Sequence, residues 1–247
     1  MEKPTAYAIV GLGGRSRIYL EAISKTYSAT SRLVALCDSN AGRLKLAADL
    51  PFVAALAPRL YSDSDFERMI AETKPDTIIV ICQDSFHDTY ICRAMELGCD
   101  VITEKPMTID AGRAQRILDT QKRTGRKVRV TFNYRYSPPR TQVKDLLMSG
   151  AIGDILSVDF QWMLDTYHGA DYFRRWHRNK ANSGGLLADR RGARHLILRY
   201  VFGMRTFQPK IAVQERRRTD RSAETRPPAR RLNFPMKSQN HEISPEE

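Results

Sequence analysis

Short apolar runs rich in β-branched residues alternate with segments of helical spacing over the first half of the chain. The apolar runs are Tyr7–Val10, Leu33–Cys37, Thr77–Cys82, Val101–Thr103 and Val128–Phe132. The segments with helical spacing are Ser16–Lys25, Ala41–Asp49, Asp65–Thr73, His87–Leu97 and Asp110–Thr124. Strands that are apolar throughout and are joined by helices indicate a parallel sheet covered on both faces. The sequence therefore predicts an α/β fold over residues 1–135, a Rossmann-type, doubly wound parallel sheet.

The pattern changes at Ser137. Pro138 and Pro139 open a helix that we expect to run to about Met148, and Ile155–Met163 then alternates apolar and polar residues like a strand with one solvated face. We expect residues 136–203 to form part of a second, incomplete α+β domain for substrate binding or oligomerisation. Residues 204–247 are rich in Arg and Pro, so we expect a basic, disordered tail there.

The net charge of +12 resides mostly at the C-terminal end of the chain. Residues 190–247 hold 14 Lys and Arg against 6 Asp and Glu, whereas residues 1–189 hold 26 against 22. Because residues 1–189 are close to neutral, nucleic-acid binding by this part of the chain is not expected. The basic run Arg216–Arg231 lacks the interleaved aromatic residues that nucleic-acid binding would favour. No apolar stretch approaches the ~18 residues of a membrane span, and no secretory signal precedes the first strand. We expect a cytoplasmic protein without nucleic-acid or membrane partners.

The four cysteines, Cys37, Cys82, Cys92 and Cys99, include no CxxC pair. Two of them end apolar runs, so buried reduced thiols are favoured over zinc ligands or disulfides. The sequence predicts no metal site.

A glycine-rich turn follows the first strand, in the sequence Gly11-Leu12-Gly13-Gly14-Arg15-Ser16. Gly11 permits the tight turn, and Gly13 lets the backbone approach a pyrophosphate lying over the helix N-terminus. Asp38 ends the second strand 22 residues after Ser16, where the acid that binds the ribose of a dinucleotide is expected. The turn and this acid together predict a nicotinamide dinucleotide site.

The same residues bear on which dinucleotide binds. Asp38 would accept hydrogen bonds from the ribose hydroxyls and repel a 2′-phosphate, which favours NAD. Arg15 could pair with that phosphate, so NADP stays open as a second choice.

The triplet Glu104-Lys105-Pro106 directly follows a predicted strand. Ligands of open α/β sheets lie beyond the carboxyl ends of the strands, so Lys105 would lie beside the nicotinamide, where it could take or give a proton. Taken without context, Lys105 is better interpreted as a solvated loop lysine.

At this point the sequence resembles the glucose-fructose oxidoreductase / inositol dehydrogenase / rhizopine-catabolism (Gfo/Idh/MocA) family. The resemblance rests on the glycine turn, Asp38, His87, the Glu-Lys-Pro triplet, Asn133-Tyr134-Arg135 and Ser183-Gly184-Gly185-Leu186-Leu187, and it covers about three quarters of the chain. It implies hydride transfer between NAD(P) and a sugar, polyol or related hydroxy compound, with Lys105 as the proton-transfer residue. The implied cofactor-binding residues are Gly11, Gly13, Gly14, Arg15, Ser16, Asp38, His87, Glu104, Lys105, Pro106, Asn133 and Arg135. His87, at the start of a helix, is also open to interpretation as a capping or surface residue.

The segment 167–177 is crowded with aromatic and charged side chains. Sugars are commonly held by an aromatic face and charged hydrogen-bonding groups, so the segment predicts a substrate site, and a lid or interface loop is an equal alternative. The candidate substrate residues are Tyr167, His168, Asp171, Tyr172, Arg175 and Trp176, with Asp189 added by the resemblance.

The resemblance weakens after the glycine pair. The family implies an acid at Asp189 and a histidine four residues later, but Ala193 stands there and His195 is two places late, out of helical register. We expect residues beyond about Ala188 not to be the family's own sequence. A homo-oligomer is expected only if the second domain is complete enough.

Two further hypotheses remain open from the sequence. One is a non-catalytic dinucleotide-binding regulator, which the absence of the expected histidine favours. The other is a glycosidase that uses a retained NAD. Retention of Lys105 favours the oxidoreductase.

Overall fold

The structure is a computed structural model that describes residues 3–133, 135, 137–154 and 174–185. Its strands are β1 (Thr5–Val10), β2 (Ser31–Cys37), β3 (Arg59–Tyr61), β4 (Thr77–Val80), β5 (Asp100–Glu104) and β6 (Val128–Thr131). Its α-helices are α1 (Ser16–Glu21), α2 (Ala41–Ala48), α3 (Pro51–Ala54), α4 (Phe66–Thr73), α5 (His87–Glu96), α6 (Ala111–Thr124), α7 (Pro138–Met148) and α9 (Lys180–Ser183). A π-helical turn η1 (Ala22–Thr26) and the 3-10 turns η2 (Asp63–Asp65), η3 (Asp84–Phe86) and η4 (Trp176–Arg178) complete the elements.

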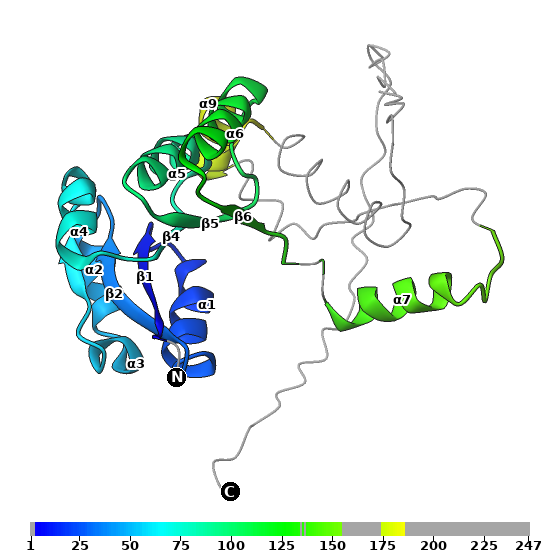
Figure 1. Cartoon of the computed structure of the whole chain (residues 1–247), viewed down its shortest axis with the longest axis horizontal. Coiled ribbons are helices and arrows are strands. Elements are labelled where there is room, and N and C mark those ends of the chain that lie inside the picture. The colour runs from blue at the N-terminus through cyan, green and yellow to red at the C-terminus, as the bar shows by residue number, and fades with distance from the viewer. Residues whose placement is uncertain (1–2, 134, 136, 155–173, 186–247) are drawn as a thin grey trace, which may run out of the picture. The chain divides into compact units, whose positions relative to one another are not determined.

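The six strands form one parallel sheet in the order β3-β2-β1-β4-β5-β6. Figure 1 shows β2, β1, β4, β5 and β6 following one another across the sheet. The chain moves outward from β1 to β3 and then crosses back to β4 on the other side of β1. This reversal opens a crevice beyond the carboxyl ends of β1 and β4, where ligands of doubly wound sheets bind.

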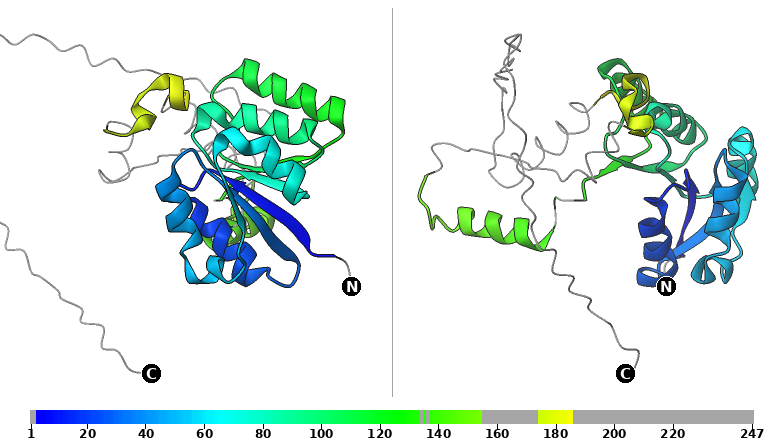
Figure 2. Two further views of the ribbon diagram at one scale, coloured as in Figure 1. Left: turned by 90° about the vertical axis from the view of Figure 1, so that its left-hand side faces the viewer. Right: turned by 180° about the vertical axis from the view of Figure 1, so that it is seen from behind.

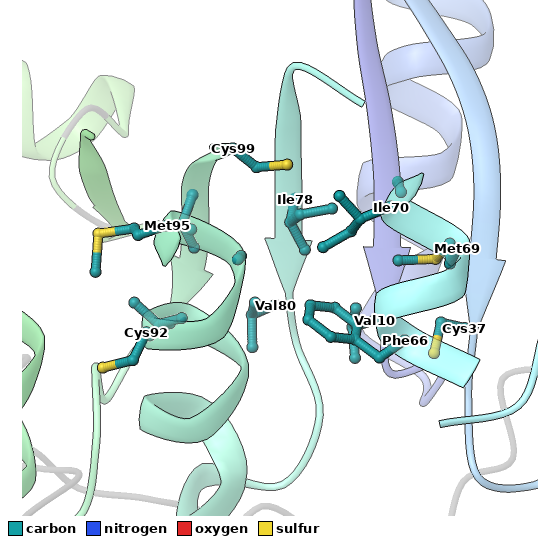
Figure 3. Packing of buried hydrophobic residues seen from close by; sticks show 14 of the residues in the cluster. Val10, Cys37, Phe66, Met69, Ile70, Ile78, Val80, Cys92, Met95 and Cys99 are labelled. Carbon is teal, nitrogen blue, oxygen red and sulfur yellow. The ribbon is translucent and has the colours of Figure 1, made fainter. Parts of the chain in front are cut away.

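Two apolar cores cover the two faces of the sheet, because successive side chains of a strand point to opposite faces. Ala8 and Val10 of β1 pack with residues of α4, α5 and α6, among them Met69, Met95 and Ile117. Figure 3 shows part of this cluster, with Val10, Ile78 and Val80 of the strands facing the helices. On the other face Ile9 packs with Leu20, Ile23, Ala47 and Val53 of α1, η1, α2 and α3. Helices on both faces are also visible in the turned views of Figure 2.

The predicted doubly wound sheet is confirmed. The five strands predicted within residues 1–135 and the helix Pro138–Met148 form, and Gly98 and Gly125, just past α5 and α6, have positive φ angles of 88° and 68°. The prediction missed β3 and α3, and it read α1 and η1 as one helix. The predicted strand Ile155–Met163 and the tail 204–247 lie outside the described residues.

Three of the four cysteines are buried, as predicted, and all four are free thiols. Burial raises the pKa of Cys37 to about 12 and that of Cys99 to about 11, so both thiols are protonated at neutral pH. Cys82 is instead partly exposed in the cleft described below, because β4 ends at Val80 and the chain has already left the sheet.

Within the described ranges, no helix combines the length and the apolar character needed to cross a bilayer. The same part of the chain holds no cluster of three or more His, Cys, Asp or Glu side chains that could bind a metal ion.

Candidate active site

A cleft of about 660 Å³ lies at the carboxyl ends of the central strands. Each of the strands β1, β2, β4, β5 and β6 leads into it, through Val10, Asp38, Ile81, Glu104 and Phe132 respectively. Its size falls within the range of cofactor and ligand sites, ≈ 300–1,000 Å³. The remaining lining residues are Gly11, Gly13, Gly14, Arg15, Ser39, Arg43, Asp63, Cys82, Gln83, Asp84, Phe86, His87, Tyr90, Lys105, Asn133, Arg175, Trp176 and His177.

The glycine turn forms one wall of this cleft. Gly11 has a φ of 92°, and a Cβ there would lie 2.4 Å from the backbone nitrogen of Cys82. Only glycine therefore lets the chain after β1 pass this close to the chain after β4. A Cβ on Gly13 or Gly14 would meet no atom within 4 Å, so the space in front of their backbone is open. Ser16 closes the turn, because its backbone N–H and its hydroxyl both donate to the carbonyl oxygen of Gly13, at 2.9 and 2.7 Å.

Asp38 fastens the glycine turn to the end of β2. Its side chain is 6% exposed, and its Oδ2 accepts a hydrogen bond of 2.6 Å from the backbone N–H of Leu12. Its Oδ1 accepts one of 2.8 Å from the N–H of Asn40. Each carboxylate oxygen can accept a further bond, so Asp38 can hold the turn and a ribose hydroxyl together.

The Glu104-Lys105-Pro106 triplet stands at the end of β5 and forms the opposite wall. Lys105 lines the cleft, and the Lys105–Pro106 peptide bond is cis. Glu104 is buried, and its carboxylate accepts hydrogen bonds from Arg15 Nε and from the Tyr19 hydroxyl, both at 2.8 Å. The glycine turn and the triplet are therefore joined directly by side chains.

His87 bridges the segments that follow β4 and β5. It is 1% exposed, with Nδ1 at 3.0 Å from the carbonyl oxygen of Pro106 and Nε2 at 3.1 Å from that of Cys82. Burial is the largest influence on the ring and lowers its pKa, against the opposing effect of the two carbonyls. The interpretation of His87 as a surface residue is therefore wrong, because its ring is buried at the cleft and holds together the segments that follow β4 and β5.

Helix α9 and the turn η4 bring a second set of residues to the cleft. Arg175 and Trp176 line it, as does His177, whose ring stacks on Trp176 with centroids 3.6 Å apart. Ser183 of α9 is buried and donates to the carbonyl oxygen of His177 at 2.8 Å, which fixes this turn.

The structure brings most of the predicted site residues together. Ser16, Pro106 and Arg135 do not line the cleft, although Ser16 and Pro106 support it through the bonds described above. The predicted substrate residues Tyr167, His168, Asp171, Tyr172 and Asp189 lie outside the described residues. No prediction from the sequence named the lining residues Ser39, Arg43, Asp63, Gln83, Asp84, Phe86, Tyr90 and Phe132, whereas His177 belongs to the predicted segment 167–177.

Some of these residues carried a signal in the sequence. Gln83, Asp84 and Phe86 directly follow a predicted strand, at the edge of the sheet where ligands bind. Asp63 lies just beyond β3, a strand that the apolar pattern did not predict. Nothing in that pattern therefore indicated that Asp63 lies near Asp38.

These residues fit a nicotinamide dinucleotide. The open space before Gly13 and Gly14 leaves room for a pyrophosphate against the backbone, and Arg15 at the same wall supplies a positive charge. Asp38 lies at the ribose position, and Lys105 lies in the same cleft.

Comparison with known proteins places this chain among oxidoreductases. Residues 5–132 match the model of an oxidoreductase family described as an NAD-binding Rossmann fold. Residues 144–226 match the C-terminal α/β domain of the same family. This second match begins close to the predicted boundary at residue 136. It extends past Ala188, so it does not support our expectation that the family's own sequence ends there.

Individual relatives agree with these matches. The chain is 37% identical over 177 residues to YteT of Bacillus subtilis, which is named as an oxidoreductase, with 71% of this chain and 41% of the relative covered. It is 27% identical over 158 residues to the D-glucoside 3-dehydrogenase of Escherichia coli, with 62% and 41% covered. The chain thus spans about two fifths of the length of these curated relatives.

A solved structure shows the same fold. The scyllo-inositol dehydrogenase of Lactobacillus casei, with bound NAD(H) and scyllo-inositol, superposes with a TM-score of 0.66 at 23% identity, covering 81% of this chain and 57% of that one.

Proposed function

Because this chain belongs to the Gfo/Idh/MocA oxidoreductase family, whose N-terminal domain is an NAD-binding Rossmann fold, we propose that it transfers a hydride between NAD and a sugar, polyol or related hydroxy compound. The observation that carries the proposal is the position of Lys105, which lies in the same cleft as the glycine turn and Asp38. The chemistry that NAD supplies when bound is acceptance of a hydride from a carbinol carbon.

Lys105 provides the other half of such an oxidation. When the carbinol carbon loses its hydride, the hydroxyl proton must leave as well, and the Lys105 amine takes it as a general base. In the reverse direction the ammonium group returns the proton to the carbonyl oxygen. The cis peptide bond and the hydrogen bond from the Lys105 N–H to Glu104 Oε2, of 3.2 Å, define the backbone that carries this amine.

The placement of Asp38 and Arg15 supports NAD over NADP. Asp38 would bring a buried carboxylate against a 2′-phosphate. Arg15, the residue that could offset this repulsion, is paired with Glu104 at β5, on the far side of β1 and β4 from Asp38. Among the described residues that line the cleft, Arg43 is a second cation that a 2′-phosphate could use.

For the substrate we propose a polyhydroxylated ring held against Trp176 and Arg175. Both line the cleft, and an aromatic face beside a guanidinium suits a sugar or cyclitol. Two proteins similar to this chain are named for such compounds, a D-glucoside dehydrogenase and a scyllo-inositol dehydrogenase. The residues Tyr167, His168, Asp171, Tyr172 and Asp189 stay predictions for the same site.

The experiment is a comparison of the wild type with Lys105→Met, by NADH titration and by turnover on a panel of sugars and polyols with NAD. We expect NADH affinity to change less than about threefold, because Lys105 acts on the substrate. We expect turnover to fall by roughly 10²- to 10⁴-fold, the usual contribution of a general acid or base. Unchanged turnover in the variant would exclude the proposed role of Lys105.

Other outcomes identify the two alternatives. Saturable NADH binding without turnover of any hydroxy compound would point to a dinucleotide-binding regulator. Cleavage of a glycoside by protein that retains its NAD, without net formation of NADH, would point to a glycosidase.

A further inference from the structure

Glu104 is a buried carboxylate that three hydrogen-bond donors hold. Its side chain is largely removed from water, and a buried charge is stable only where it is paired and hydrogen-bonded. Oε1 accepts from Arg15 Nε and from the Tyr19 hydroxyl, whereas Oε2 accepts from the backbone N–H of Lys105. The same carboxylate therefore contacts the glycine turn, helix α1 and the backbone of Lys105.

Tyr19 connects this carboxylate to the neighbouring strand. Its hydroxyl lies 2.7 Å from Thr131 Oγ1 at the end of β6, and Thr131 Oγ1 also lies 3.1 Å from the carbonyl oxygen of Thr103. Burial raises the pKa of the Tyr19 hydroxyl above its ordinary value, so it stays protonated and remains a donor to Glu104. Tyr19 does not line the cleft, so its part in the network is separate from any contact with a ligand.

Arg15 connects the network to the interior of the cleft. It lines the cleft directly after Gly13 and Gly14, and its side chain is 39% exposed. Nε is the atom that donates to Glu104, and within the described part of the chain Glu104 is the acid that pairs with Arg15. Its two terminal nitrogens can therefore donate to an anion above the turn, because a guanidinium presents its five N–H groups as a planar fork.

We propose that Glu104 is a positioning residue that fixes the backbone of Lys105, and that Arg15 couples this position to the occupant of the glycine turn. The identity of that occupant, a dinucleotide pyrophosphate, rests on the proposed function. A pyrophosphate over the glycine turn would accept from the terminal nitrogens of Arg15 while Arg15 Nε donates to Glu104, so we expect Lys105 to be held most firmly when the dinucleotide is bound. Tyr19 keeps Glu104 in place from the side that the ligand does not reach.

The test measures hydrogen exchange of the Lys105 amide by NMR on the full ¹⁵N-labelled chain, since this N–H is the one that Glu104 accepts. The variants are Glu104→Gln and Tyr19→Phe, which conserve shape, with Tyr27→Phe as the control because Tyr27 is exposed. Without any ligand, we expect both variants to speed this exchange by roughly three- to tenfold, the effect of weakening one hydrogen bond. The control should match the wild type. Unchanged exchange in Glu104→Gln would overturn the positioning role.

A second arm tests the coupling through Arg15. NADH at saturating concentration should slow the Lys105 exchange in the wild type and should leave it unchanged in Arg15→Gln, once that variant is also saturated. Equal slowing in both proteins would overturn the coupling. Failure of the proposed function is recognised separately, because fluorescence titration would then show no NADH binding. That result would also remove the coupling, while the ligand-free comparison would still decide the role of Glu104.

Discussion

At the scale of single residues, the polar side chains of the cleft bind the protein's own backbone as well as facing the cleft. Asp38 and His87 illustrate this, because each occupies a predicted cofactor position and each also ties two loops of the protein together. Their residue types could be read from the sequence. Their hydrogen-bond partners could not, because those partners are backbone groups brought close only by the fold.

His87 predicts a dependence of stability on pH. A neutral imidazole has one N–H for the two carbonyl oxygens that face it, and burial lowers the pKa of the folded ring below the unfolded value of about 6.5. The unfolded chain therefore binds the proton more readily, so the contribution of His87 is present above about pH 6.5 and is lost as the pH falls below it. The loss cannot exceed about 1.4 kcal/mol per pH unit.

Urea unfolding at pH 7.5 and 5.5 measures this effect. We expect His87→Gln to lose less stability than the wild type between the two values. His241→Gln, in the tail that the sequence predicts to be disordered, serves as the control and should behave like the wild type. An equal loss in all three proteins would show that His87 does not titrate as its burial implies.

At the scale of elements, we expect the turn between β1 and α1 to separate a glycine that the fold requires from one that ligand binding requires. Gly11 has a positive φ and its missing Cβ would collide with the backbone at Cys82, whereas Gly13 faces open space. We expect Gly11→Ala to lower the free energy of unfolding by at least about 3 kcal/mol, and Gly13→Ala to change it by less than about 0.5 kcal/mol.

NADH titration of the same pair completes this prediction. Gly13→Ala should weaken NADH binding by roughly tenfold or more, because its methyl group projects to where the pyrophosphate lies. If Gly13→Ala bound NADH like the wild type, the open space at Gly13 would not be the pyrophosphate site.

The elements also show what the apolar pattern could predict. The strand Thr77–Val80 is buried on both faces of the sheet, so its residues form a continuous apolar run that the sequence alone could identify as a strand. The missed strand β3 is three residues long, lies at the edge of the sheet and leaves Leu60 exposed, so it carries no such pattern. The π-helical turn η1 continues α1 without a break in composition and could not be distinguished from it.

At the scale of the whole molecule, the six-stranded parallel sheet is the Rossmann fold that the family model describes for residues 5–132. The second domain, in contrast, is known mainly from the sequence match. The match to the C-terminal α/β domain covers residues 144–226, of which the structure describes 144–154 and 174–185. Arg175 and Trp176 could be predicted as site residues because the segment around them is too polar for a core. The predicted substrate residues Tyr167, His168, Asp171, Tyr172 and Asp189 lie outside the described residues, so their place at this site stays a prediction.

Titration of the full chain with NADH and NADPH, by fluorescence and thermal shift, shows whether the cleft binds NAD. We predict saturable binding of NADH, a stabilisation of about 2.7 kcal/mol at a hundredfold excess over Kd, and binding of NADPH at least about tenfold weaker. Asp38→Ala should weaken NADH binding. Absence of saturable binding by a chain that circular dichroism shows to be folded would contradict the account.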